Sequence, residues 1–386
     1  NQRGIMSSAA NYFVMGPGAN GGTNGGTNGG TNGGTNGGTN GGTAADGGDL
    51  GIGLLTSREG TCLPANTNSL VIGKGFPKHW PARWAPRVQM QTHIQSVLQR
   101  LRISAKPASN GKPALAQLDF LRLKQSAGEV DKTKLLVLEH PTNGRFRDEL
   151  PAVLAAAELR ADRYHEILTQ SEGAWPYWRA IYPMRPDQMV QTQLLLDVAV
   201  ECCTYLGMRL KYVFGDFRPS ELSPEVQPLL PTPGHATYPM GHAAQNYAVA
   251  AMLAFIARDL HHTNDSLNAL VDEAFRLAHR ISVNRVIAGT HFPVDVHGGA
   301  LLGITVAQTV WSMAIKCLPA TNASFPALPP VGEYPDGAGL FSFVNAAGVE
   351  MHDGKAVEDT EDLVSLHAVG TVVQREWSRF EAPGEI

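Results

Sequence analysis

The chain has 386 residues and is nearly neutral, with 31 basic and 35 acidic residues and a net charge of −4. This length allows one large domain or two ordinary ones around a buried core. The balanced charge argues against a nucleic-acid or anionic-membrane partner, and no stretch is apolar for the length of a membrane span. We therefore expect a soluble protein. No signal peptide is visible, so its compartment is open, and a signal peptide already cleaved would make it secreted or periplasmic.

The beginning of the chain is predicted to be irregular. Residues 20–43 repeat Asn-Gly-Gly-Thr six times, and a sequence that is half glycine cannot build an apolar core. We favour a flexible tether for this repeat, and a regular polar ladder facing carbohydrate or ice is the alternative. The irregular N-terminal segment is expected to cover residues 1–84.

Helical patterns dominate the middle of the chain. Apolar residues at helix spacing begin near Arg87, a strong amphipathic pattern covers 148–169, and a long helix is expected from about Asp187 to Leu210. The short apolar run Leu135–Leu138 is a candidate strand.

A proline-dense loop over 220–241 precedes three further helices, predicted from His242 to about Leu260, over 266–284 and over 291–316. Small residues near the start of the last helix permit close helix approach. The sequence predicts an all-α helical bundle as a catalytic domain over 85–317. A loop-rich extension with one short element is expected over 318–386.

The stretch 282–299, SVNRVIAGTHFPVDVHGG, predicts the end of one helix, a tight turn and the start of another. Gly289 is suited to the end of the first helix and Thr290 to the N-cap of the second. His291 and Asp295 are four residues apart, so the carboxylate can hold one imidazole nitrogen. The other nitrogen is then available as a base, nucleophile or ligand.

Three blocks of basic residues and histidine are informative together. Taken alone, each block has a plain structural explanation. The blocks are Lys211 with Arg218, the Gly241-His242 pair at a predicted helix start, and Arg285. Together they supply enough donors for a tetrahedral oxyanion with several negative charges. The helix start adds backbone N–H groups and the positive end of a dipole.

In this order the blocks resemble the signature of the type 2 phosphatidic acid phosphatase and vanadium haloperoxidase superfamily, KX6RP, PSGH and SRX5HX3D. The resemblance covers residues 211–295, and the chain looks most similar to the bacterial vanadium haloperoxidase-like members. It implies that Lys211, Arg218 and Arg285 hold the oxygens of phosphate or vanadate, together with the backbone N–H of Gly241.

The resemblance also implies roles for the histidines. His291 would be the phosphohistidine nucleophile or the axial vanadium ligand, oriented by Asp295. His242 would be the general acid of a phosphatase or the group bonded to the apical oxygen of vanadate. His235 matches a position where the bromoperoxidases of the family carry a second histidine, which makes it a candidate halide-site residue; a plain loop histidine is the alternative.

Two positions depart from this signature. Met240 replaces the serine of PSGH and removes a hydroxyl donor, which would cost on the order of 3 kcal/mol of transition-state stabilisation if nothing replaced it. Asn284 replaces the serine before Arg285, and its amide can still donate a hydrogen bond.

The sequence-based hypothesis is a vanadium-dependent haloperoxidase, with vanadate as cofactor and peroxide, halide and an organic acceptor as small-molecule substrates. One alternative is a soluble acid phosphatase that hydrolyses phosphate esters without a cofactor. Another is a non-catalytic phosphate- or vanadate-binding relative weakened by Met240. Many relatives are dimers, so a homodimer is compatible with the resemblance.

Overall fold

The computed structural model describes residues 86–107, 113–123, 130–182, 184–185, 188–260, 265–319, 329–334, 352–356 and 361–377. The predicted irregular segment over 1–84 and its Asn-Gly-Gly-Thr repeat therefore lie outside the described residues.

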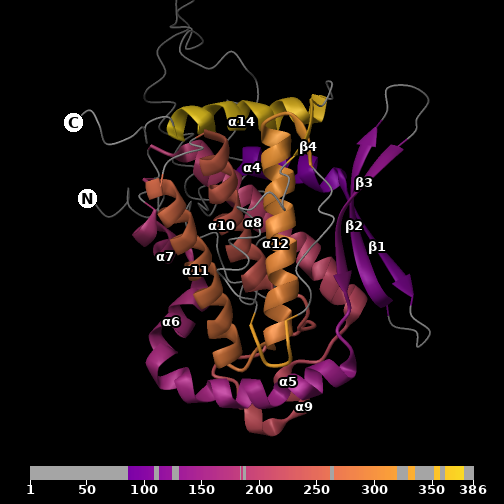
Figure 1. The fold of residues 1–386 in the computed structure, drawn as a ribbon, viewed down its shortest axis with the longest axis vertical. Helices are drawn as coiled ribbons and strands as arrows, with labels where there is room; N and C mark the ends of the chain where they lie inside the picture. The colour runs from indigo at the N-terminus through magenta and orange to yellow at the C-terminus, as the bar shows by residue number, and fades with distance from the viewer. Residues whose placement is uncertain are drawn as a thin grey trace, which may run out of the picture.

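Long helices run side by side through the centre of the molecule (Figure 1): α8 (Val190–Phe214), α10 (Gly241–Leu260), α11 (Asp265–Ile287) and α12 (Pro293–Ala314). Every residue of α12 is buried, and this helix packs against both α10 and α8. Their apolar side chains belong to one continuous core. The helical bundle predicted from periodicity is confirmed for this part of the chain.

Helices α10 and α12 approach each other closely because α12 carries glycine at the contact. A Cβ atom added at Gly303 would lie 2.2 Å from the carbonyl oxygen of Ala244, and one added at Gly299 would lie 2.4 Å from that of Met240. Both distances are shorter than a real Cβ contact, so only glycine fits there. The expectation that the small residues of this helix permit close approach is confirmed.

The protein also contains a small antiparallel sheet. It is therefore mostly helical, and the all-α prediction is corrected to this extent. Strands β1 (Leu101–Pro107), β2 (Pro113–Leu123) and β3 (Val130–Glu139) pair in the order β1-β2-β3, beside the bundle (Figure 1). Ala116, Leu118 and Phe120 are buried at every second position, which is the strand period. This alternation with polar residues is the pattern of a half-buried strand, and it was missed because Gly- and Lys-containing polar segments flank it. The candidate strand Leu135–Leu138 is the buried end of β3.

Most of the remaining elements lie at the two ends of the bundle, and α7 lies beside α11 (Figure 1). The region 148–169, predicted as a single helix, contains two helices separated by a 3₁₀ turn. The prediction missed this turn because apolar periodicity continues through it. The elements are α4 (Pro86–Gln99), α5 (Asn143–Ala156), η2 (Ala157–Leu159), α6 (Arg160–Glu172), α7 (Trp175–Ile181), α9 (Pro219–Leu222), η3 (Pro224–Val226), β4 (Cys317–Pro319), β5 (His352–Ala356) and α14 (Glu361–Trp377).

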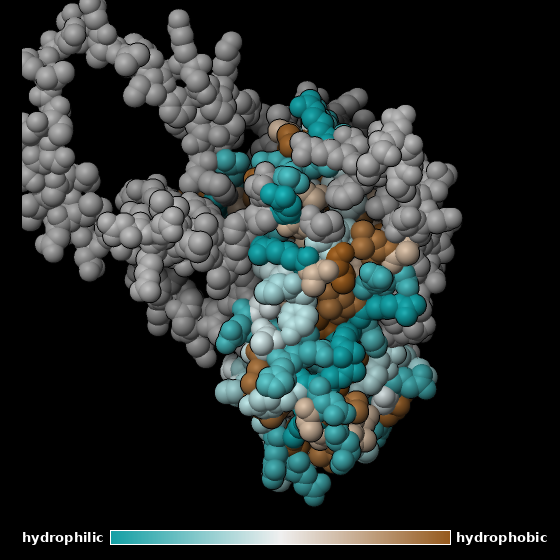
Figure 2. Space-filling model, turned by 90° about the vertical axis from the view of Figure 1, so that its left-hand side faces the viewer, coloured by the Kyte–Doolittle hydropathy of each residue, from teal (hydrophilic) through white to brown (hydrophobic). Residues whose placement is uncertain are grey.

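The surface agrees with the balanced composition. Hydrophilic residues cover most of the described surface on the face shown in Figure 2. Among the described residues, none of the helices combines the length and the apolar character that crossing a membrane requires.

The glycine contact between α10 and α12 predicts a selective loss of stability. Gly303→Ala should destabilise the fold by about 1–3 kcal/mol, because the added methyl group overlaps the backbone of α10. Gly207→Ala in α8 is the matched control, since its Cβ would meet only a Leu302 methyl group at 3.9 Å. Thermal unfolding of both variants checks this, and equal effects would contradict it.

Candidate oxyanion site

The turn between α11 and α12 lies at the end of the bundle nearest α5 (Figure 1). Gly289 has φ +78°, a backbone conformation that suits glycine, so its predicted place after α11 is confirmed. The Thr290 hydroxyl donates to the Arg285 carbonyl oxygen at 2.9 Å. Thr290 therefore closes α11 and is not the N-cap of α12, since two residues separate it from the start of that helix at Pro293.

His291 and Asp295 are joined across the start of α12. Nδ1 of His291 lies 2.9 Å from Oδ2 of Asp295, and both side chains are buried. The same carboxylate oxygen accepts the backbone N–H of Phe292 at 2.9 Å and the hydroxyl of Thr237. Because the Asp295 carboxylate accepts a hydrogen bond from Nδ1 of His291, the proton of the neutral imidazole is held on Nδ1. Nε2 of His291 therefore keeps its lone pair. Burial lowers the pKa of His291 well below its usual value, and the charges of Arg218 and Lys211 lower it further.

Arg218 and Lys211 reach the same place from the end of α8. One terminal nitrogen of Arg218 lies 3.1 Å from Nε2 of His291 and 2.7 Å from the carbonyl oxygen of Thr290. Lys211 Nζ donates to the carbonyl oxygens of Ala236 and Thr237 at 2.8 and 2.7 Å. Burial lowers the pKa of Arg218 to about 10 and that of Lys211 well below its usual value. An anion on Nε2 of His291 must therefore displace Arg218 from that atom.

Arg285 and His242 carry buried nitrogen atoms without partners. Arg285 donates from one terminal nitrogen to the Ile167 carbonyl oxygen at 2.8 Å, but its Nε and other terminal nitrogen, and Nε2 of His242, have none. Buried polar atoms are rarely left unpaired in a native protein, so these atoms indicate a polar ligand. Burial and the Arg285 charge lower the pKa of His242 to about 3. Such a set of donors fits a tetrahedral oxyanion, whether phosphate or vanadate.

The other predicted site residues border this group. Gly241 begins α10. His235 lies in the preceding loop, where its Nδ1 is 3.1 Å from a terminal nitrogen of Arg218, and burial lowers its pKa to about 4. Met240 is buried in the core and presents no polar side-chain atom to an anion. Asn284 donates to Gln170 and Glu166 on α6 at 2.9 and 3.1 Å, so its amide serves the contact between helices.

Two residues of this region carried no sequence signal that we used. Thr237 holds Asp295 with its hydroxyl and Lys211 with its carbonyl oxygen. Glu149, which is fully buried, accepts the backbone N–H of Val294 at 2.9 Å and so caps the start of α12.

The fold and the site define a mostly helical protein with a buried cluster of cationic and histidine side chains at one end of its bundle. Residues 192–318 match the PAP2 superfamily model, and this part of the chain is a PAP2 superfamily domain. Among solved structures, the chain is similar to the first transmembrane PAP2-type phosphatidylglycerolphosphate phosphatase from Bacillus subtilis. The two share 19% sequence identity with a TM-score of 0.33, over 43% of this chain and 84% of that one. No curated protein matches the chain.

The unpaired donors predict that a tetrahedral anion stabilises the protein. Inorganic phosphate or vanadate should raise the Tm, by an amount equivalent to about 2.7 kcal/mol at one hundred times Kd. Arg285→Met should remove most of this shift. Arg280→Met is the matched control on the same helix, because Arg280 is half exposed and pairs with Glu166. Differential scanning fluorimetry measures both, and a full shift in Arg285→Met would contradict the assignment.

Proposed function

We propose that this protein hydrolyses phosphate esters through a phosphohistidine formed on His291. The observation that carries the proposal is the arrangement of unpaired nitrogen atoms of Arg285 and His242 near His291, whose Nε2 keeps its lone pair. The PAP2 superfamily domain supports the same reaction class, since it contains every residue of this arrangement.

The proposed reaction has two steps that use the same histidines. His291 Nε2 attacks phosphorus, the bond from phosphorus to the ester oxygen breaks, and His242 gives its proton to the departing alkoxide. Water then attacks the phosphohistidine, His242 takes a proton from it, and inorganic phosphate leaves. Arg218 and Arg285 hold the phosphoryl oxygens, where their charge stabilises the transition state. Asp295 keeps His291 oriented and stabilises the charge that develops on its ring.

The haloperoxidase expected from the sequence would use the same residues. Lys211, Arg218 and Arg285 would hold vanadate, His291 would be its ligand, and vanadate when bound would supply the activation of peroxide. Hydrolysis is the better-supported proposal for two reasons. The family match is to PAP2, and Lys211 already donates to two loop carbonyls while Met240 offers no hydroxyl. A resident cofactor needs donors permanently, whereas a phosphatase holds its anion only during turnover.

A paired assay separates these functions. Hydrolysis of an aryl phosphate should be found in the absence of vanadate and should be abolished in His291→Ala. Dye bromination with vanadate and peroxide is measured in parallel. His165→Ala is the control, because His165 is an exposed histidine on α6. Bromination without phosphatase turnover would overturn our proposal in favour of the haloperoxidase. Anion binding without either activity would indicate a non-catalytic relative.

The low pKa of His242 predicts a specific pH dependence. A general acid must carry its proton, so activity should fall as the pH rises above its pKa. That pKa is about 3 in the protein without an anion, because burial and Arg285 disfavour the cation. A bound phosphate dianion opposes this and should raise the pKa. Since kcat/KM reports the free enzyme and kcat the complex, the descending limb of kcat should lie at higher pH. Coincident limbs, after correction for substrate ionisation, would contradict this assignment.

A further inference from the structure

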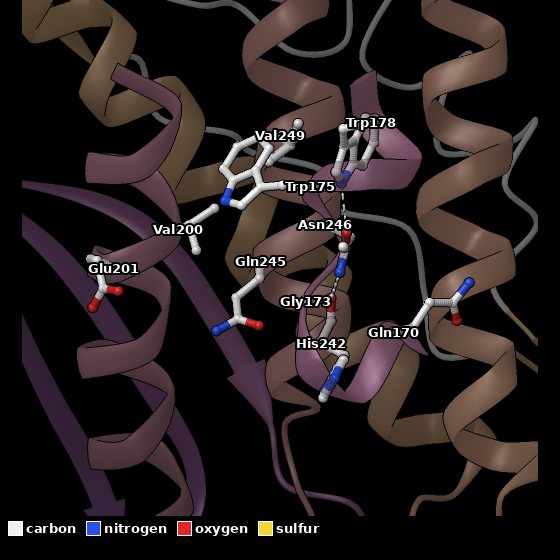
Figure 3. A pocket seen from close by; sticks show the side chains of 11 residues that line it. Gln170, Gly173, Trp175, Trp178, Val200, Glu201, His242, Gln245, Asn246 and Val249 are labelled. Atoms are coloured by element: carbon white, nitrogen blue, oxygen red, sulfur yellow. Dashed lines mark hydrogen bonds between the residues drawn. The ribbon is translucent and has the colours of Figure 1, made fainter. Parts of the chain in front are cut away.

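A pocket of about 40 Å³ extends from His242 between α8, α10 and the segment that joins α6 to α7. Among its lining residues are Trp175 on α7, Val200 and Glu201 on α8, and Gln245 and Val249 on α10. In Figure 3, His242 lies at the opposite end of the pocket from Trp175 and Trp178. None of these residues apart from His242 belongs to the sequence blocks of the oxyanion site.

The position of the pocket relates it to the leaving group. In the proposed reaction, the departing oxygen of the ester receives its proton from His242. The organic part of the substrate must therefore lie on the His242 side of the phosphoryl group, away from His291. His242 is the residue shared by the anion site and the pocket, so an alcohol attached to the phosphoryl group has this pocket next to it.

The size of the pocket restricts the alcohol. One water molecule needs roughly 10–15 Å³ of such space, so 40 Å³ holds on the order of three water-sized groups. The pocket walls are held in place: Trp178 Nε1 donates to Asn246 at 2.8 Å, and Asn246 donates to the His242 carbonyl oxygen at 2.8 Å. A chain of two or three carbons fills this volume, and because the pocket is partly open, a longer chain would extend out of it.

The polar groups of the pocket favour hydroxyl groups on that chain. Gln245 donates from Nε2 to Thr204 at 2.9 Å, which leaves its carbonyl oxygen to accept. Figure 3 shows this oxygen on the side facing His242. Glu201 also lines the pocket, and burial raises the pKa of its carboxyl group. Trp175 offers an apolar ring and an indole N–H. A hydroxyl group can donate to Gln245 and accept from Trp175.

We propose that this pocket binds the alcohol part of the substrate and selects phosphate monoesters of short, hydroxylated alcohols. Gln245 is the specificity-determining residue, because its carbonyl oxygen accepts a hydrogen bond that an unsubstituted alkyl chain cannot provide. This inference rests on the proposed phosphatase function and names its substrate class.

The test compares three primary alkyl esters of similar chemical reactivity: glycerol phosphate, n-propyl phosphate and decyl phosphate. We expect kcat/KM for glycerol phosphate to exceed that for n-propyl phosphate by at least about ten-fold, a typical effect of one or two hydrogen bonds. Decyl phosphate, whose chain would extend out of the pocket without adding a hydrogen bond to Gln245, should also be a poorer substrate than glycerol phosphate. Glycerol phosphate equal to or below either alkyl ester would overturn the proposed specificity and leave the phosphatase function standing. Failure of all three esters, and of an aryl phosphate, would instead overturn the proposed function.

A substitution in the pocket provides the second arm. Gln245→Leu should bring the ratio of kcat/KM for glycerol and n-propyl phosphate close to one and leave competitive inhibition by inorganic phosphate unchanged. Gln374→Leu is the matched control, because Gln374 is an exposed helical glutamine on α14. A loss in Gln245→Leu that is equal for both esters and for phosphate inhibition would indicate a structural role and overturn the proposal.

Discussion

Buried positive charge is the constraint on which the arrangement of this molecule depends. Lys211, Arg218 and Arg285 are 3%, 2% and 1% exposed, and the nearby carboxylates of Asp295 and Asp216 balance only part of their charge. Taking an ion out of water costs several kcal/mol unless other groups solvate it. Backbone carbonyl oxygens provide much of this solvation, from Ala236 and Thr237 for the lysine and from His235, Thr290 and Ile167 for the arginines. The loop before α10, the turn before α12 and helix α6 therefore converge on one end of the bundle.

This convergence explains which parts of the site could be predicted from sequence. Four of the site residues lie at or near helix ends, where sequence spacing is informative: Lys211, Arg218, His242 and Arg285. The pairing of His291 with Asp295 depends only on adjacent helical turns. The carbonyl partners of the cations belong to other segments and have no side-chain signature. Thr237 and Glu149 were missed for the same reason. Thr237 is 58 residues from Asp295 and Glu149 is 145 residues from Val294, so only the folded chain brings each pair together.

The fold was predictable where periodicity is strong and uninterrupted. The helices of the bundle are buried on wide faces, and their apolar spacing located them to within a few residues. The sheet was missed although Ala116, Leu118 and Phe120 alternate with Gln117 and Asp119 in β2, because Gly- and Lys-containing polar segments flank this short run. Amphipathic periodicity likewise did not reveal the 3₁₀ turn at Ala157–Leu159. The departures at Met240 and Asn284 were visible in the sequence, but their environments, one in the core and one between helices, required coordinates.

The glycine contact between α10 and α12 also affects how the site meets its ligand. His242 stands at the start of α10 and His291 just before α12, and Gly299 brings the backbone of α12 against that of α10 beside Met240. Because this contact is made by backbone atoms, no side-chain rotamer change can alter the distance between the two helices. The separation of the two histidines is thus set before any ligand arrives, and little conformational entropy is lost in bringing the proposed acid and nucleophile into place. Such pre-organisation leaves ligand-induced rearrangement to the side chain of Arg218, which must move away from His291.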